Sequence, residues 1–158
     1  MTNCKIKKGL CLIGFIAIIM AIGFTVAGIT AEHILGWYSA INHPSFAPPN
    51  WLFGPVWSVI YIMIAIAGWL VFLKGHLKGK VLGVYVIQLA LNFLWSIVFF
   101  SYHEIGLALL EMTVLWVFII WNIRLFLPIS RVASYLLVPY ILWVSFAWIL
   151  NLSFLLLN

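Results

Sequence analysis

The residues most suited to chemistry lie between Trp37 and Tyr61, in a stretch that carries four of the six prolines and three of the nine tryptophans. Proline fixes φ and has no N–H to donate, so Pro44 to Pro49 cannot form a regular helix. Aromatic rings on a stiff, non-helical loop suit a lid that covers an apolar cavity. The alternative is a belt of aromatic side chains at a membrane surface, where Trp and Tyr collect.

Polar and aromatic residues also recur at helical spacing within four long apolar segments. The stripes are Gln88, Asn92, Trp95, Ser96 and Phe99; Tyr140, Trp143, Ala147 and Asn151; Glu111 and Asn122; and Trp57, Tyr61, Ala65 and Gly68. Polar side chains are costly in hydrocarbon and therefore mark faces that point inward. We expect these faces to surround one cavity for a flat, largely apolar molecule, because an ion would need denser charge or carbonyl coordination.

These polar residues also have a structural interpretation, which stays open at this point. Gln88, Asn92 and Asn151 can tie helices together through hydrogen bonds. Glu111 is the one carboxylate well inside an apolar segment. It is either a proton site or a hydrogen-bonded structural residue.

Motifs of familiar enzyme and metal chemistry are absent from the sequence. There is no Ser-His-Asp spacing, HExxH, CxxC or glycine-rich phosphate loop. The four histidines lie in expected loops or at helix ends without metal-ligand spacing, so we predict no metal site. They are His33, His43, His76 and His103. Cys4 and Cys11 are too few for a disulfide framework, and no basic patch interleaved with aromatic residues suggests nucleic acid binding.

The composition defines the class of protein. The chain has 158 residues, of which 66% are hydrophobic and 7% are charged, whereas a soluble domain carries roughly 25% charged residues. The apolar runs are continuous rather than alternating, which excludes a β-barrel. We therefore predict an all-α integral membrane protein with one domain, residues 1–158. The apolar run that ends at Ala31 exceeds a typical signal peptide and lacks a clear cleavage site, so it is expected to remain as the first helix.

Five segments are long enough to cross a membrane, since a spanning helix needs about 20 apolar residues. We place these helices at about residues 9–31, 51–73, 81–101, 105–127 and 133–157, with a long Pro/Trp-rich loop between the first and second. Asn50 is expected to cap the second helix. Pro139 is expected to kink the last one.

All eight Lys and Arg residues fall on one side of this arrangement, or within a turn of it. They are Lys5, Lys7, Lys8, Lys74, Lys78, Lys80, Arg124 and Arg131. Basic residues favour the cytoplasmic side, so the pattern predicts an N-in, C-out topology. Gly83 and Ala90 on the third helix suit either helix packing or a dimer, as do Gly23 and Ala27 on the first, where packing is preferred. No internal repeat is evident, which argues against many transporter folds.

The motifs assembled above resemble those of the TspO/MBR family, which includes tryptophan-rich sensory proteins and the mitochondrial translocator protein. After Trp37-Tyr38, residues 44–61 read P-x-F-x-P-P-x-W-x-F-x-P-V-W-S-x-x-Y, residues 88–100 read Q-L-x-L-N-x-x-W-S-x-x-F-F, and residues 139–151 read P-Y-x-x-W-x-x-F-A-x-x-L-N. Glu111 stands where the family usually has an acid. The similarity covers most of the chain from Trp37 onward.

The resemblance implies a five-helix bundle, often dimeric, with a pocket under the loop between the first two helices. Family ligands are tetrapyrroles such as protoporphyrin IX and haem, cholesterol in animal members, and synthetic isoquinoline carboxamides and benzodiazepines. Carried over by motif position, the ligand-binding residues are Trp37, Pro44, Trp51, Asn92, Trp95, Trp143, Phe146 and Ala147. The chain ends N-L-S-F-L-L-L-N, without the Tyr and basic residue of the animal cholesterol motif, so strong sterol recognition is not expected there.

Three functions follow from this resemblance. The leading one is a membrane receptor or sensor for tetrapyrroles, with no required cofactor, surrounded by lipid in a bacterial inner membrane and acting as a homodimer. The second is an enzyme that degrades bound porphyrin in light, with Trp51 and Trp143 as electron-donating catalytic residues. The third is a porphyrin or lipid transporter, which the sparse charges within the helices count against.

Overall fold

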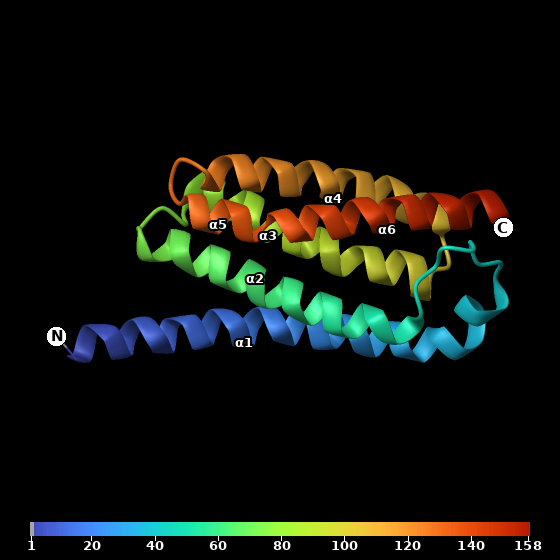
Figure 1. The fold of residues 1–158 in the computed structure, drawn as a ribbon, viewed down its shortest axis with the longest axis horizontal. Coiled ribbons are helices and arrows are strands. Elements are labelled where there is room, and N and C mark those ends of the chain that lie inside the picture. Colours follow the sequence, from blue (N-terminus) through green and yellow to red (C-terminus); the bar gives the residue numbers. More distant parts are fainter. Residues whose placement is uncertain (1) are drawn as a thin grey trace.

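The computed structural model describes the backbone of residues 2–158 and the side chains of residues 6–158. Five membrane-length helical segments form a bundle (Figure 1). Their helices are α1 (Thr2–His33), α2 (Phe53–Leu73), α3 (Gly79–Ser96), α4 (Ile105–Phe126), α5 (Arg131–Leu136) and α6 (Val138–Leu157). The described part of the chain contains no strand. The predicted five-helix membrane fold is thereby confirmed. Cys11 is a free thiol on α1, whereas the side chain of Cys4 lies outside the described residues.

The first membrane segment is longer than the sequence predicts. α1 continues into a π-helix, η1 (Ile34–Tyr38), so Trp37 and Tyr38 lie on helical backbone rather than in the loop. Gly36 kinks this segment with φ −100° and ψ −107°. Residues 42–49 stay non-helical, as the prolines require. Asn50 was expected to precede the second helix, but it begins a 3₁₀ turn, η2 (Asn50–Leu52), that leads into α2.

The remaining segments begin and end close to the expected residues. α3 continues into a second π-helix, η3 (Ile97–Ser101), at the end of the third segment. The fifth segment is divided at Leu137, between α5 and α6, just before Pro139. Proline removes a helical N–H and clashes with the preceding turn, which explains the predicted break. Ser130 caps α5 by accepting a hydrogen bond from the Ala133 amide at 3.4 Å.

The two ends of the bundle differ in charge. One end, which we call the basic end, contains the N-terminus and the connections at residues 74–78 and 127–130; the other, the loop end, contains residues 42–49, the α3–α4 turn and the C-terminus (Figure 1). The described basic residues lie toward the basic end. The described basic residues therefore gather on one side of the bundle, as expected. The cytoplasmic location of this side stays a prediction.

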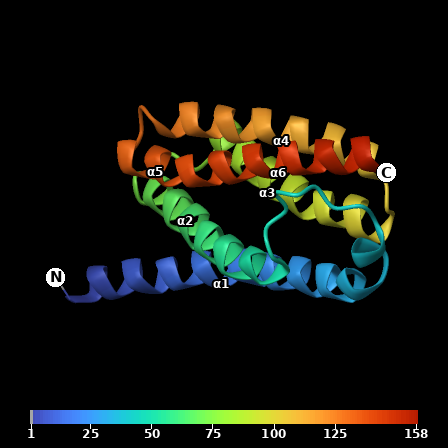
Figure 2. The same ribbon diagram turned by 45° about the vertical axis from the view of Figure 1, so that its right-hand side comes forward.

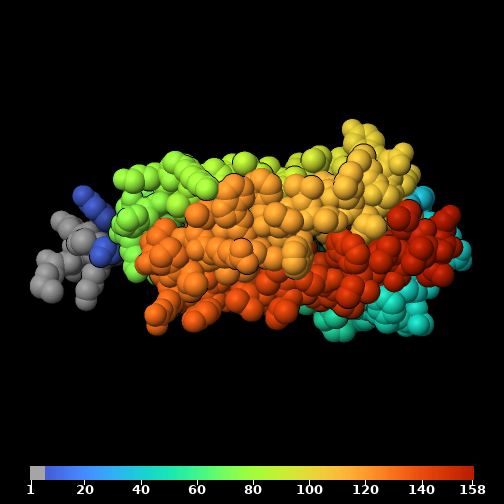
Figure 3. All heavy atoms as spheres, turned by 90° about the horizontal axis from the view of Figure 1, so that it is seen from above, coloured from blue at the N-terminus to red at the C-terminus, as the bar shows by residue number. Residues whose placement is uncertain are grey.

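α1 packs mainly against α2 and stands apart from most of the bundle (Figure 2). Among its described side chains, Ile19 is the one that is fully buried. Gly23 brings the two helices close, since a Cβ at this position would lie 2.6 Å from the Tyr61 ring. On another face, α4 and α6 lie side by side (Figure 3). There Trp148 donates to Thr113 at 2.8 Å, and Trp116 donates to Ser145 at 2.9 Å.

Candidate functional site

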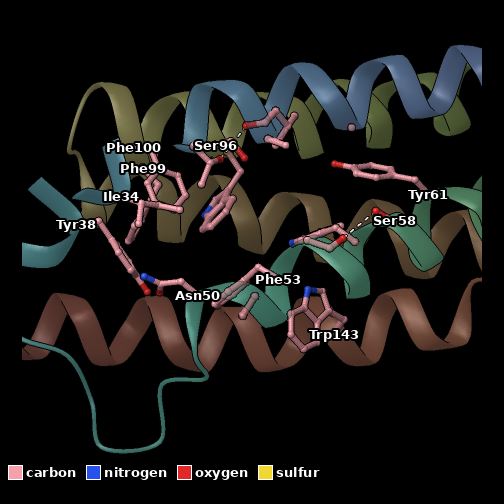
Figure 4. A pocket seen from close by; sticks show the side chains of 18 of the residues that line it. Ile34, Tyr38, Asn50, Phe53, Ser58, Tyr61, Ser96, Phe99, Phe100 and Trp143 are labelled. Atoms are coloured by element: carbon pink, nitrogen blue, oxygen red, sulfur yellow. Dashed lines mark hydrogen bonds between the residues drawn. The ribbon is translucent and has the colours of Figure 1, made fainter. Parts of the chain in front are cut away.

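A cavity of about 440 Å³ lies between α1, α2, α3 and α6, in the half of the bundle nearer the loop end (Figure 4). Its walls are mainly aromatic. They include Trp51, Trp57, Tyr61, Trp95, Phe99 and Trp143. The volume falls within the range of roughly 300–1,000 Å³ that is usual for small-molecule sites.

Four of the eight predicted ligand-binding residues line this cavity, namely Trp51, Trp95, Trp143 and Ala147. Trp95, Trp143 and Ala147 come from helices whose inward face was recognised by its spacing, whereas Trp51 comes from the 3₁₀ turn η2. Trp143 projects from α6 and Tyr61 projects from α2 toward the same space (Figure 4). The expected convergence of the second, third and fifth segments is therefore present at the loop-end half.

Two predicted residues support the wall from behind instead of lining it. Asn92 is buried, and its Oδ1 accepts a hydrogen bond from the Tyr61 hydroxyl at 2.7 Å. This bond fixes the tyrosine whose ring forms part of the wall. Phe146 packs on Trp143, with ring centroids 5.5 Å apart, and on Phe46 of the loop at 6.4 Å.

The other two, Trp37 and Pro44, lie at the loop end and do not line the cavity. The Trp37 ring stacks on His103 at 4.3 Å, with an interplanar angle of 17°. The loop that carries Pro44 is fastened to the end of α6. There the backbone N–H of Asn42 donates to Asn158 Oδ1 at 2.8 Å, and Asn158 Nδ2 donates to the backbone carbonyl of Asn42 at 3.1 Å. The loop expected as a lid, residues 42–49, thus contributes no residue to the wall, and the first lining residue after it is Asn50 of η2.

A layer of aromatic side chains closes the cavity toward the loop end, and motif reasoning did not select it as a site. Tyr38, Phe99, Phe100 and Phe154 are all buried in this layer. The Phe99 ring lies 4.9 Å from Phe100 and 5.8 Å from Phe154. Tyr38 belongs to η1 and the two central phenylalanines belong to η3. The η1 segment is kinked at Gly36, where the backbone leaves the helical region, and this glycine is the sequence signal for the kink.

The polar stripes divide between the cavity and the packed core. Ser96 and Asn151 line the cavity. In the amide orientation that satisfies both ends, Asn151 accepts from Trp95 Nε1 and donates to the Ile105 carbonyl, each at 3.2 Å. Gln88 and Asn122 are fully buried and lie outside the lining. α4 contributes no residue to the lining, so the expectation that every stripe faces one cavity is wrong for Glu111 and Asn122. In α2, α3 and α6 it holds only for the loop-end half of the helix.

The chemistry of the lining is neutral. None of the described residues around the cavity is charged, and no histidine or cysteine is among them. Among the described side chains, no group of three potential metal ligands is found. Trp143 Nε1 is buried in the wall without a protein acceptor, and Glu111 lies outside the lining. The site therefore offers ring faces, a few hydroxyl and amide groups, and the unpaired indole N–H of Trp143.

Comparison with known proteins adds family membership to this geometry. Residues 15–157 match the model of the TspO/MBR family. The chain belongs to the TspO/MBR family. It is similar to the tryptophan-rich protein TspO of Archaeoglobus fulgidus, with 38% identity over 148 residues that cover 93% of this chain and 96% of the relative.

Two further relatives span microbes and animals. The tryptophan-rich protein TspO of Chlorobaculum tepidum is 40% identical over 146 residues, which cover 90% of this chain and 92% of the relative. The human translocator protein is 35% identical over 121 residues, which cover 74% of this chain and 72% of the relative. Together with the five apolar helices, membership of the TspO/MBR family makes the chain an integral membrane protein.

Proposed function

We propose that this TspO/MBR protein is a membrane receptor or sensor that binds tetrapyrroles, such as protoporphyrin IX or haem, or similarly flat apolar ligands in the cavity. The observation that carries the proposal is the neutral wall of tryptophan, tyrosine and phenylalanine rings. Aromatic rings stack favourably on flat conjugated molecules. Since no histidine or cysteine is among the described lining residues, haem would be held through its ring rather than through protein ligation by these groups.

A titration of the purified protein with protoporphyrin IX in the dark tests this proposal. We expect saturable quenching of tryptophan fluorescence and a shifted Soret band. Trp143→Ala should weaken binding, whereas Trp121→Ala should not, because Trp121 lies on α4 outside the lining. Equal affinity of both variants and the unmodified protein would contradict the assignment of the cavity.

A second candidate function is light-dependent degradation of the bound porphyrin. The observation that favours it is that Trp51 and Trp143 both line the cavity, so their indoles would lie beside an excited ring. Illumination of the complex tests this activity. A product spectrum that requires protein and disappears in Trp51→Phe and Trp143→Phe supports an enzyme, whereas bleaching at the same rate in all variants supports a binding protein. Transport of porphyrin or lipid is weaker, because the lining carries no charge to couple to an ion.

We also propose that the protein lies in a bacterial plasma membrane with its basic end inside, and that it forms a homodimer through α3. The gathering of basic residues at one end supports the orientation.

A Cβ at Gly83 would meet no atom within 4 Å, and Ala90 is exposed on the same helix. These small residues leave a face on which a second helix can pack closely. Loss of the dimer in Gly83→Leu, measured by light scattering of the purified protein, tests this interface.

A further inference from the structure

We infer that ligands enter the cavity sideways from the lipid bilayer, through an opening between α1 and α2, instead of passing the loop. This inference rests on the proposed function, since it concerns how the same cavity is filled. It follows from two independent features: exposed lining residues on one side of the cavity, and a closed aromatic layer at its loop end.

The exposed residues of the lining belong to α1 and to the start of the second segment. Phe24 and Ala27 come from α1, Asn50 and Trp51 come from η2, and Gly54 comes from α2; all five line the cavity and are exposed. Phe24 and Trp51 are each 70% exposed. A side chain that borders a cavity and is also largely exposed stands at its mouth. The mouth therefore lies between α1 and the η2–α2 segment.

The position of the mouth along the helices places it against lipid. Phe24 lies within the membrane-length segment Ile6–Tyr38, and at 1.5 Å per residue it is about 21 Å along the axis from Tyr38. The hydrocarbon layer is about 30 Å thick, so an opening at this depth faces acyl chains. Toward the basic end, the two helices touch where Gly23 meets the Tyr61 ring, which closes the gap below the mouth.

The route past the loop is closed by packing. Tyr38, Phe99 and Phe154 are buried at the loop end, and the ring of Tyr38 lies 5.5 Å from that of Phe154. Figure 4 shows Tyr38, Phe99 and Phe100 at one end of the cavity. The loop outside this layer is held to the C-terminal end of α6 by the hydrogen bonds between Asn42 and Asn158. Entry from water would require all of these contacts to open.

The lateral opening also restricts the chemistry of the ligand. A molecule that enters here must first dissolve in the bilayer, and its apolar body must pass between Phe24 and Trp51. Carboxylates or other charged groups would have to stay toward the interface, because the lining offers them no basic partner. Flat amphiphiles with their charges at one edge meet both requirements.

Gly54 provides the test, because a Cβ at this position meets no atom within 4 Å and the residue borders the mouth. Gly54→Phe places an aromatic ring at the opening, and its Cβ has open space around it. Gly28→Phe is the matched control: Gly28 also has open space at its Cβ and is exposed on α1, but it does not line the cavity. Asn158→Ala removes the two hydrogen bonds that hold the loop to the end of α6, and it tests the alternative route. All variants are reconstituted in nanodiscs and mixed with protoporphyrin IX in a stopped-flow fluorimeter.

For Gly54→Phe we expect association to slow by about fivefold or more, while Gly28→Phe and Asn158→Ala associate at the normal rate. Dissociation should slow with association, since a narrowed route affects both directions. An association rate in Gly54→Phe equal to that of Gly28→Phe would overturn the inference, as would faster association in Asn158→Ala. If the unmodified protein shows no saturable binding, the proposed function fails; saturable binding with unchanged rates in Gly54→Phe rejects only the lateral route.

Discussion

In the half of the bundle nearer the loop end, Trp95 and Trp143 border a cavity, whereas nearer the basic end Tyr85 and Phe126 stack on each other in a filled core. Both halves are rich in aromatic side chains. The two halves differ in the residues that face these aromatic rings. Gly68 lets Tyr85 approach so closely that its hydroxyl donates to the Ile64 carbonyl at 3.0 Å. Residue type alone therefore does not distinguish a binding wall from a packed core.

The same comparison separates the amides. Asn151 holds Trp95 in the cavity wall, and Asn92 holds Tyr61 from behind it. Gln88 and Asn122 are buried outside the cavity, deeper toward the basic end. Amides on the inward faces of these helices thus hold cavity-lining rings in one half of the bundle and lie within the packed core in the other.

The largest effect should come from filling the close contact in the packed half. In Gly68→Ala, the new Cβ would lie 2.4 Å from the Tyr85 hydroxyl, which is itself hydrogen-bonded. We expect the free energy of unfolding in detergent to fall by about 1–3 kcal/mol. Gly54→Ala in the cavity half should change it by no more than about 0.5 kcal/mol, because nothing lies within 4 Å of that Cβ. Equal losses in the two variants would remove the distinction between the halves.

Removal of an exposed ring at the cavity should lower the affinity for porphyrin without lowering the stability of the fold. Trp51 is largely exposed, so Trp51→Ala removes ligand contact and little packing. We expect porphyrin affinity to drop about tenfold, equivalent to about 1.4 kcal/mol. Fluorescence titration measures the affinity, and thermal unfolding serves as the control. A drop in stability with unchanged affinity would place Trp51 in the packed structure instead.

A smaller effect is expected where the wall is supported from behind. Tyr61→Phe keeps the ring at the cavity but removes the 2.7 Å hydrogen bond to Asn92. The buried amide loses its donor, so the free energy of unfolding should fall by about 1 kcal/mol. Porphyrin affinity should change less than in Trp51→Ala, since the ring remains. An affinity loss as large as that of Trp51→Ala would indicate direct ligand contact by the hydroxyl.

The smallest effect should come from the hydrogen bonds that join α4 and α6 away from the cavity. Trp116→Phe removes the bond from its indole to Ser145. Bonds between membrane helices contribute about 0.6 kcal/mol on average, and we expect a loss of that order with unchanged porphyrin affinity. Unfolding in a denaturing detergent measures the first quantity, and titration with protoporphyrin IX measures the second.

Periodicity in the sequence predicted much of the bundle because helix faces are local. The spacing of Gln88, Asn92 and Ser96 identified a buried face, and Pro139 identified the break between α5 and α6. The C-terminal end of the first segment was harder to predict from the sequence. An apolar run does not reveal that Trp37 and Tyr38 continue the helical backbone beyond the kink at Gly36.

The residues that line the cavity were predicted in part, and this prediction came from motif positions instead of periodicity. Motif positions selected Trp51, Trp95, Trp143 and Ala147, which line the cavity. The position of the loop depends on contacts between residues far apart in the sequence: Asn42 is hydrogen-bonded to Asn158, 116 residues later. No local sequence pattern encodes such a contact. The sequence therefore did not predict that the loop lies against the end of α6.

We propose that a flat apolar ligand binds in the cavity in the loop-end half of the bundle. An experimental structure of the protein with protoporphyrin IX would show where the ligand lies. We predict that the tetrapyrrole ring contacts Trp95 and Trp143, with its carboxylates toward the interface. A porphyrin found instead in the shallow groove between Pro55 and Pro139, on the outer side of α2 and α6, would contradict it.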